Sequence, residues 1–449
     1  MATSDRKKGR TPRETALHLL RRIETGGAYA DRILASREVG DLALLDRSFV
    51  RELVLGVLRW KLRLDHIIDR YYTGKPSSLK PAIRMILRLG LYQMMFLDAV
   101  PEWAAVNESV EMASRVSGRG AAGLVNALLR RFSREGEPPV PAGDPTEQIS
   151  VEQSFPRWIT QRWIDQFGQE TAEAVMQASN EKHAVSIRAN TRQTSVGSLI
   201  SALADEGFEA VESEMPGYLV VPKATGLFDS SLFREGRFIA QDGAAAMAAI
   251  LLDPKPGELV LDLCSAPGGK TTHCAELMND SGRIDAVDRN RARLGLVHDA
   301  AERLSHRSIT CIEGDAAMFG SDGEKWYDRI LLDVPCTGTG VFSKRPDMKW
   351  RKNRRDLERI ATLQFEMLVN AGRLLKPGGV LVYSTCSLEP EEDEVVVHRY
   401  LELTAEERGY DVAEMRDDRF KKYEREVGYL ILPHEMHGAG AFAVKLKRG

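Results

Sequence analysis

The sequence predicts a multidomain protein: an all-α bundle at the N-terminus, a small α+β subdomain, and an α/β domain with a doubly wound, mostly parallel sheet. Two patterns lead to this prediction. Apolar residues recur at three- and four-residue spacing through residues 11–134, where strand-like runs are scarce. From about residue 237, short apolar runs alternate with helical stretches, which favours parallel strands joined by helices. The 449 residues suffice for two or three such domains.

The helical pattern defines the N-terminal domain. Helices are expected at Thr15–Ile23, Phe49–Ile68, Pro81–Tyr92, Ala104–Val116 and Ala121–Phe132. The stretch 135–145 is rich in proline and glycine, which is typical of an extended linker. We therefore assign residues 1–137 to a helical domain and residues 138–149 to a linker.

Two further domains are expected after the linker. In residues 150–236, strands at 184–188 and 218–221 accompany a helix at 199–206. In residues 237–449, strands are expected at 259–263, 283–287, 308–312, 328–332 and 379–383. Segments 429–432 and 441–446 are expected to pair as an antiparallel ribbon at the sheet edge.

Charge is distributed unevenly along the chain. The formal net charge is −3, but residues 1–135 carry 24 Lys and Arg against 15 Asp and Glu. A basic N-terminal region suggests a polyanionic partner. An ordinary solvated helical surface explains the same count equally well, so charge alone leaves both interpretations open.

Cysteine usage and hydropathy limit the cellular compartments in which we expect the protein. The five cysteines form no C-x-x-C pair, so neither a disulfide framework nor a zinc site is expected. His434 and His437 lack the glutamate of the metalloprotease motif, and we expect no metal there. No apolar run reaches membrane-spanning length, and no apolar stretch follows the basic residues 1–10. We expect a cytoplasmic monomer without metal.

A glycine-containing loop follows the strand at 259–263 and precedes a helix. Such a loop brings backbone N–H groups and a helix N-terminus close to a ligand. The P-loop pattern would need glycine at Cys264, and G-x-G-x-x-G is absent, so an adenosine-containing ligand without a diphosphate remains. Asp288 ends the next strand, where a ribose-binding carboxylate is expected. Gly268 and Gly269 could otherwise simply form a tight turn.

Two cysteines follow the last apolar residues of two later strands. Asp333-Val-Pro-Cys336 follows one strand, and Cys386 follows the other. If these strands are neighbours, both thiols face the crevice beside the glycine loop. Cysteine is also often a small buried hydrophobic residue, an interpretation that suits Cys274, Cys311 and Cys264 better. Lys270 or a helix N-terminus could lower the pKa of a catalytic thiol.

Methylation of cytosine at carbon 5 needs these three groups: an adenosine-type methyl donor, a thiolate and a carboxyl group. Carbon 5 is a poor nucleophile. Thiolate addition to carbon 6 creates an enamine-like intermediate that can attack the methyl group of S-adenosylmethionine. A carboxyl group at ring nitrogen 3 would stabilise the adduct, and a base would then remove the proton from carbon 5.

The motifs resemble those of the RNA cytosine-5 methyltransferases of the NOL1/NOP2/Sun family. The matching segments are 263–271, 286–290, 314–315, 333–336, 346–350 and 383–387. The resemblance implies a nucleophile at Cys386 and a thiol at Cys336 that assists product release. It implies a Rossmann-like domain with catalytic roles for Asp333 and Lys270. The implied S-adenosylmethionine site comprises Cys264, Ser265, Ala266, Pro267, Gly268, Gly269, Lys270, Asp288, Arg293, Asp315 and Asp333.

A second resemblance covers the N-terminal domain. Segments 45–59, 98–110 and 123–130 are similar to NusB-type RNA-binding helical domains. Fusion of such helices to this catalytic domain implies action on one cytosine of small-subunit (16S) ribosomal RNA. Methylation of transfer RNA or large-subunit ribosomal RNA, and a non-catalytic RNA-binding assembly factor, are the alternatives. Basic side chains in and beside the segment 346–350 could hold RNA, and a solvated surface loop explains each of them equally well: Lys344, Arg345, Lys349 and Arg351.

Overall fold

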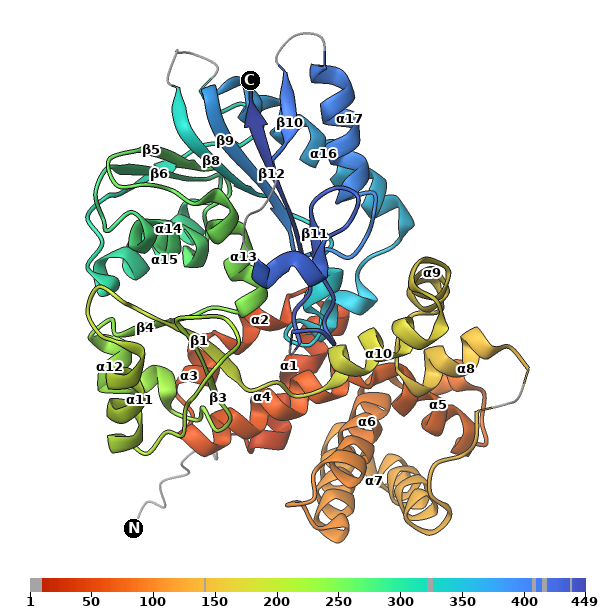
Figure 1. Cartoon of the computed structure of the whole chain (residues 1–449). Helices are drawn as coiled ribbons and strands as arrows, with labels where there is room; N and C mark the ends of the chain where they lie inside the picture. The colour runs from red at the N-terminus through yellow and green to blue at the C-terminus, as the bar shows by residue number, and fades with distance from the viewer. Residues whose placement is uncertain (1–9, 141–142, 321–325, 406–408, 414–417, 437) are drawn as a thin grey trace. The chain divides into compact units, whose positions relative to one another are not determined.

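The computed structural model describes residues 10–449 except 141–142, 321–325, 406–408, 414–417 and 437 (Figure 1). The prediction for His437 therefore lies outside the described residues. The chain forms two compact units. Residues 1–180 with 343–351 form the first, which we call the helical unit. Residues 181–342 with 352–449 form the second, which we call the sheet unit.

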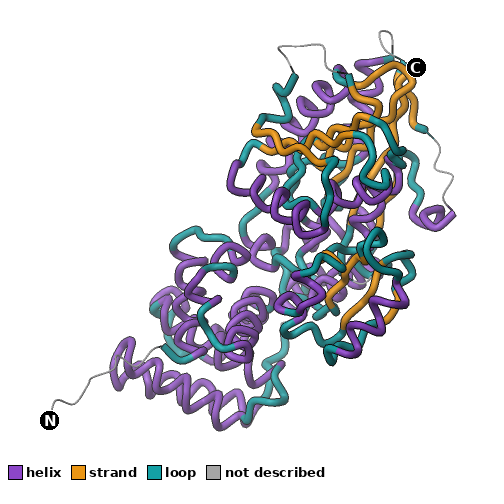
Figure 2. The backbone as a smooth tube through the Cα atoms, turned by 90° about the vertical axis from the view of Figure 1, so that its left-hand side faces the viewer, coloured by secondary structure: helices purple, strands orange, loops and turns teal. Residues whose placement is uncertain are grey.

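The helical unit contains no strand among its described residues (Figure 2). Its helices are α1 (Pro12–Thr25), α2 (Ala30–Leu34), α3 (Arg37–Gly40), α4 (Leu44–Arg59), α5 (Lys61–Tyr71), α6 (Pro81–Phe96), α7 (Glu102–Glu135), α8 (Pro145–Glu152), α9 (Arg157–Phe167) and α10 (Gln169–Asn180). Within the segment predicted as a linker, helix α8 thus begins at Pro145. Thr11 starts α1 with a capping box, in which its side chain and that of Glu14 satisfy each other's backbone N–H groups.

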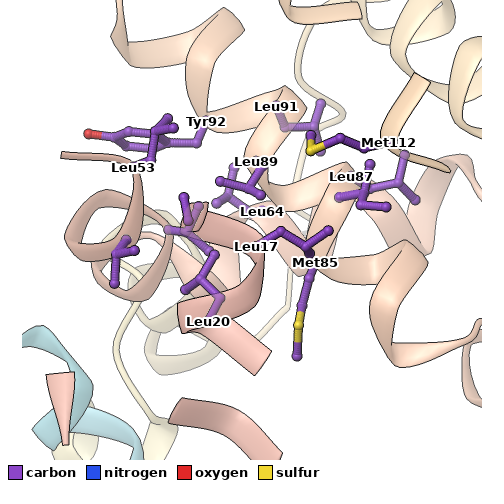
Figure 3. Close-up of a cluster of buried hydrophobic side chains, with 14 of the residues drawn as sticks. Leu17, Leu20, Leu53, Leu64, Met85, Leu87, Leu89, Leu91, Tyr92 and Met112 are labelled. Atoms are coloured by element: carbon purple, nitrogen blue, oxygen red, sulfur yellow. The ribbon is translucent and has the colours of Figure 1, made fainter. Parts of the chain in front are cut away.

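The core of the helical unit joins helices α1 to α7. Leu17 and Leu20 of α1, Leu53 of α4 and Leu64 of α5 pack with residues of α6 and α7 (Figure 3). Gly56 of α4 permits a close approach, because a Cβ there would lie 1.9 Å from the ring of Tyr92. The apolar residues at three- and four-residue spacing in the sequence are therefore the ones that face this shared core.

Two breaks interrupt the helical pattern. The stretch Phe49–Ile68, predicted as one helix, is divided at Trp60 between α4 and α5, where φ is −103° and ψ is 17°. Apolar spacing continues across such a bend, which explains why periodicity missed it. Inside α7, Gly118 has φ 80° and ψ −176°. This break falls between the two stretches predicted as separate helices.

The first sheet of the sheet unit has four strands in the order β2-β3-β1-β4. Its strands are β1 (Val185–Ala189), β2 (Val211–Glu212), β3 (Tyr218–Val221) and β4 (Phe238–Ala240), with α11 (Val196–Asp205) between β1 and β2. Strands β1 and β3 and helix α11 are at the positions predicted from the sequence. Strands β2 and β4 were missed because two or three residues show no resolvable alternation.

The second sheet has the order β10-β12-β9-β8-β5-β6-β7, with β11 also paired to β12. Its strands are β5 (Leu259–Asp262), β6 (Arg283–Asp288), β7 (Ile309–Glu313), β8 (Tyr327–Asp333), β9 (Leu375–Thr385), β10 (Tyr410–Val412), β11 (Tyr429–Ile431) and β12 (Ala441–Arg448). The pairs β6–β7, β5–β6, β5–β8 and β8–β9 are parallel. The predicted fold class is confirmed.

The antiparallel ribbon forms with one difference. Strand β12 pairs with β11 and also with β9, so it belongs to the sheet. The sheet edge beyond β12 is β10, which the sequence analysis did not predict. Helices α14 (Gly269–Leu277) and α15 (Arg291–Leu304) lie on one side of this sheet, and α16 (Arg354–Arg373) and α17 (Glu394–Thr404) on the other (Figure 1).

Candidate active site

The carboxyl ends of three adjacent strands bring the predicted motifs together. Strand β8 lies between β5 and β9, and all three run parallel. The glycine loop follows β5 at Asp262, and Asp333 at the end of β8 lies in register with Ser384 of β9. The prediction that the two cysteine-bearing strands are neighbours is confirmed.

The two thiols are in direct contact. The Sγ atoms of Cys336 and Cys386 are 3.1 Å apart. The pKa of Cys386 is lowered, first because the thiol of Cys336 donates a hydrogen bond to it, and also because Lys270 is a nearby cation. The pKa of Cys336 is raised by the same hydrogen bond and by burial. Cys386 is therefore the thiol that ionises first.

Lys270 and Asp333 form an ion pair beside the thiols. The Lys270 Nζ atom lies 2.5 Å from Asp333 Oδ1, which also accepts a hydrogen bond from the Ser384 hydroxyl at 2.9 Å. Burial opposes the charged form of Lys270, but the carboxylate of Asp333 outweighs burial and raises the pKa of the ammonium group. Lys270 is therefore protonated in the free site and stabilises anions there.

The glycine loop is held against strand β6. The backbone N–H groups of Cys264 and Ser265 both donate to the carbonyl oxygen of Val287. Gly268 has φ 101°, a left-handed conformation, and a Cβ there would lie 3.1 Å from Val297 Cα. Helix α14 begins at the next residue, Gly269. Gly268 is thus needed for the backbone path, whereas a Cβ at Gly269 would meet nothing closer than 3.7 Å.

Asp262 is a candidate site residue that was not assigned from the sequence. Its Oδ2 atom accepts a hydrogen bond from the Thr271 hydroxyl at 2.6 Å, but its buried Oδ1 atom has no partner. Burial raises the pKa of Asp262 to about 7. An unpaired buried acceptor is costly unless a ligand supplies a donor. The Asp at the end of an apolar strand was the available sequence signal.

Three predicted cofactor residues lie near the ends of two strands: Asp288 ends β6, Arg293 is in the first turn of α15, and Asp315 follows β7. Arg293 forms an ion pair with Asp288 at 3.4 Å and donates to the carbonyl oxygen of Ala266 at 2.6 Å, so it ties the glycine loop to β6. Asp288 also accepts from the N–H of Asn290 at 2.8 Å. Asp315 follows β7, is exposed, and accepts from the N–H of Ala317 at 3.0 Å.

A buried arginine also supports the glycine loop. Arg188 of β1 is only 2% exposed and donates to the carbonyl oxygen of Gly269 at 2.9 Å. It also pairs with Glu276 of α14 at 2.8 Å. The small sheet thereby fixes the start of α14. A charged residue in an alternating strand gave no sign of this role.

The prediction of RNA contacts around the segment 346–350 is wrong for Lys349. This segment belongs to the helical unit, where Lys349 is fully buried and donates to Asn180 Oδ1 at 2.6 Å. Its ammonium group lies 3.6 Å from the ring centroid of Phe155. Arg351 is partly buried and donates to the carbonyl oxygen of Gly27 at 2.9 Å. These contacts leave the Lys349 ammonium group inaccessible to phosphate.

Three segments match known families. Residues 249–447 match the family described as 16S rRNA methyltransferase RsmB/F, residues 10–134 match the NusB family, and residues 155–225 match the ferredoxin-like domain of RsmF/B-like methyltransferases. The fold and site therefore define a methyltransferase domain preceded by a NusB-type helical domain.

Curated relatives resemble the chain along nearly its full length. A probable ribosomal RNA small subunit methyltransferase B of Bacillus subtilis is 33% identical over 97% of this chain and 98% of the relative. The ribosomal RNA small subunit methyltransferase B of Pasteurella multocida is 33% identical over 90% of this chain and 88% of the relative. The chain belongs to the RsmB/F methyltransferase family, which confirms the resemblance seen in its motifs.

Solved structures agree in fold. The crystal structure of PH0851 covers 98% of this chain and all of its own, with a TM-score of 0.79 and 28% identity. A methyltransferase homolog from Pyrococcus horikoshii covers 68% of this chain with a TM-score of 0.58 and 26% identity. Among the described residues, no helix combines the length and apolar character needed to cross a bilayer.

Proposed function

We propose that this protein methylates carbon 5 of a specific cytosine in 16S ribosomal RNA, with S-adenosylmethionine as methyl donor and a covalent bond between Cys386 and the cytosine. The observation that carries the proposal is the thiol pair. Cys386, with its lowered pKa, lies 3.1 Å from a second thiol and beside the Lys270–Asp333 ion pair. The names of the curated relatives support small-subunit ribosomal RNA as substrate.

The cofactor site suits a ligand that carries hydrogen-bond donors. The unpaired Oδ1 atom of Asp262 can accept from an amino group. We expect Asp288, at the end of β6, to accept from ribose hydroxyls. Asp315 lies beyond the next strand, beside the expected position of adenine. When bound, S-adenosylmethionine would supply the electrophilic methyl group. The glycine loop would approach it without Cβ atoms at Gly268 and Gly269.

The thiolate of Cys386 begins the reaction by adding to carbon 6 of the cytosine. The Lys270 ammonium group, held in place by Asp333, would stabilise the negative charge that develops on the base as the adduct forms. Carbon 5 becomes nucleophilic as a result. The target base must leave its stack to reach this crevice.

Release needs a base at carbon 5. The hydrogen bond with Cys386 is the main reason that the pKa of Cys336 is raised. Once the sulfur of Cys386 is bonded to carbon 6, its negative charge is gone, so Cys336 loses its proton to water more easily. Cys336 then takes the proton from carbon 5. The electron pair forms the ring double bond, and Cys386 leaves as a thiolate.

Bisulfite mapping of 16S ribosomal RNA tests the proposal. Cells lacking the protein should lose one 5-methylcytosine. Expression of the wild-type protein should restore it, and expression of Cys386→Ala should not. Cofactor binding by Cys386→Ala should stay near normal, which separates loss of the nucleophile from misfolding. Restoration of the mark by Cys386→Ala would remove the nucleophile assignment.

A further inference from the structure

A single buried carboxylate connects the two cysteine loops. Glu392 lies between β9 and α17 and is fully buried. Its Oε1 atom accepts from the backbone N–H of Thr337 at 2.8 Å. Its Oε2 atom accepts from the hydroxyls of Thr337 and Ser387, the latter at 2.5 Å. Thr337 follows Cys336 and Ser387 follows Cys386, so one side chain holds the residue after each thiol.

Further contacts bracket the same loops. The side-chain amide of Gln364 in α16 donates to Glu392 Oε1 at 3.2 Å and to the carbonyl oxygen of Pro335 at 3.0 Å. The N–H of Gly340 donates to the carbonyl oxygen of Cys386 at 2.9 Å. The Cys336 loop is therefore held on both sides of its cysteine, and the Cys386 loop is held at its cysteine and at the residue that follows. Glu392 is the acceptor common to both loops.

These contacts matter because neither cysteine lies inside a strand. Cys386 follows the last residue of β9, and Cys336 follows the last residue of β8 by three positions. The sheet ladder alone does not fix their sulfur atoms. Several hydrogen bonds from both loops and from Gln364 converge on the Glu392 carboxyl group, and together they make a stiff connection.

We propose that Glu392 is a positioning residue that sets the separation of the Cys386 and Cys336 sulfur atoms. The proposal rests on the covalent mechanism above. Cys386 must reach carbon 6 and Cys336 must reach the proton on carbon 5, which are neighbouring ring atoms. Both sulfurs must therefore stand close together while the loops admit a nucleotide. Glu392 touches neither sulfur and acts through Thr337 and Ser387.

Disulfide formation measures this separation without RNA or cofactor. Diamide takes two hydrogen atoms from a pair of thiols and leaves a disulfide, at a rate that depends on how often the sulfurs meet. The Cys336–Cys386 disulfide is quantified by mass spectrometry of non-reduced peptides. We expect the disulfide to form in Glu392→Ala at a rate about tenfold or more below that of wild type. Small misplacements of reacting atoms reduce reaction rates by factors of this size.

Two variants separate positioning from general stability. Glu392→Gln should give an intermediate rate, because its amide oxygen can still accept from Thr337 N–H. Asp285→Asn is the matched control: Asp285 is a buried carboxylate that accepts from the Tyr327 hydroxyl at 2.8 Å. Tyr327 begins β8, at the opposite end of the strand from the cysteine loops. This variant should crosslink at the wild-type rate.

Single-hydroxyl variants complete the test. Thr337→Val and Ser387→Ala each remove one donor to Glu392, and each should slow crosslinking and methyl transfer. If Glu392→Ala fails to fold, the crosslinking rates of these two variants test the positioning role in its place. Wild-type crosslinking in Glu392→Ala, or in both hydroxyl variants, would overturn the positioning role. Normal turnover by Cys386→Ala would instead overturn the covalent mechanism and leave the crosslinking result intact.

Discussion

The unpaired acceptor of Asp262 gives a quantitative prediction about stability. Burial raises the pKa of this carboxyl group from 3.8 to about 7. At about 1.36 kcal/mol per pKa unit, ionisation of Asp262 costs about 4 kcal/mol more in the folded protein than in the unfolded chain. Between about pH 4 and pH 7 the folded state keeps a proton that the unfolded state has released. The Asp262 contribution to the free energy of unfolding therefore falls as pH rises through this interval.

Asp262→Asn removes the ionisation and changes this pH dependence. The amide oxygen can accept from Thr271, but the amide NH₂ then takes the unpaired position and costs about 1–3 kcal/mol. We expect the variant to be less stable than wild type at about pH 5. Between about pH 5 and pH 8 the difference in unfolding free energy should move by about 3 kcal/mol in favour of the variant, because ionisation of the buried carboxyl group destabilises wild type alone.

Urea unfolding at about pH 5 and pH 8 measures the difference. Asp280→Asn is the control, because the pKa of Asp280 is shifted in the opposite direction. Burial raises the pKa of Asp280, but hydrogen bonds from the backbone of Arg307 and Ser308 outweigh burial, and the pKa is lowered. Its stabilisation is complete above about pH 4 and is lost only at lower pH, so the Asp280→Asn difference should be equal at the two pH values. An Asp262→Asn difference that is also unchanged between them would refute the reasoning.

Three other predictions concern the proposed reaction. Cys336→Ala should accumulate a covalent protein–RNA adduct on denaturing gels, and normal product without adduct would contradict its release role. Lys270→Met should move the pH dependence of Cys386 alkylation to higher pH, because the cation that favours the thiolate is lost; an unchanged profile would exclude this effect. Deletion of residues 1–134 should weaken RNA binding and reduce its salt dependence, whereas unchanged affinity would show that these helices are no RNA anchor.

Local patterns were sufficient to locate the strands that carry the site. Strand β8 and the start of α14 lie where alternating or apolar runs and the glycine loop predicted them. Short strands such as β2 and β10 were missed, because their few residues become strands only through pairing with neighbours. The bend at Trp60 was missed because apolar periodicity continues across it.

Contacts between distant residues were beyond prediction from the sequence. Thr337 and Glu392 are 55 positions apart, and nothing in either segment indicates that they meet. The burial of Lys349 against Phe155 depends on a segment that leaves the sheet unit and joins the helical unit. A lysine beside other basic residues ordinarily predicts a solvated surface.

The sequence by itself determined the class of fold and the chemical groups of the site, because strand, glycine loop and cysteine motifs are written in consecutive residues. Only the tertiary structure decided the 3.1 Å contact of the two sulfurs, the unpaired oxygen of Asp262 and the position of Glu392. Distances and pKa values depend on which side chains surround a group after folding, and those neighbours come from remote parts of the chain.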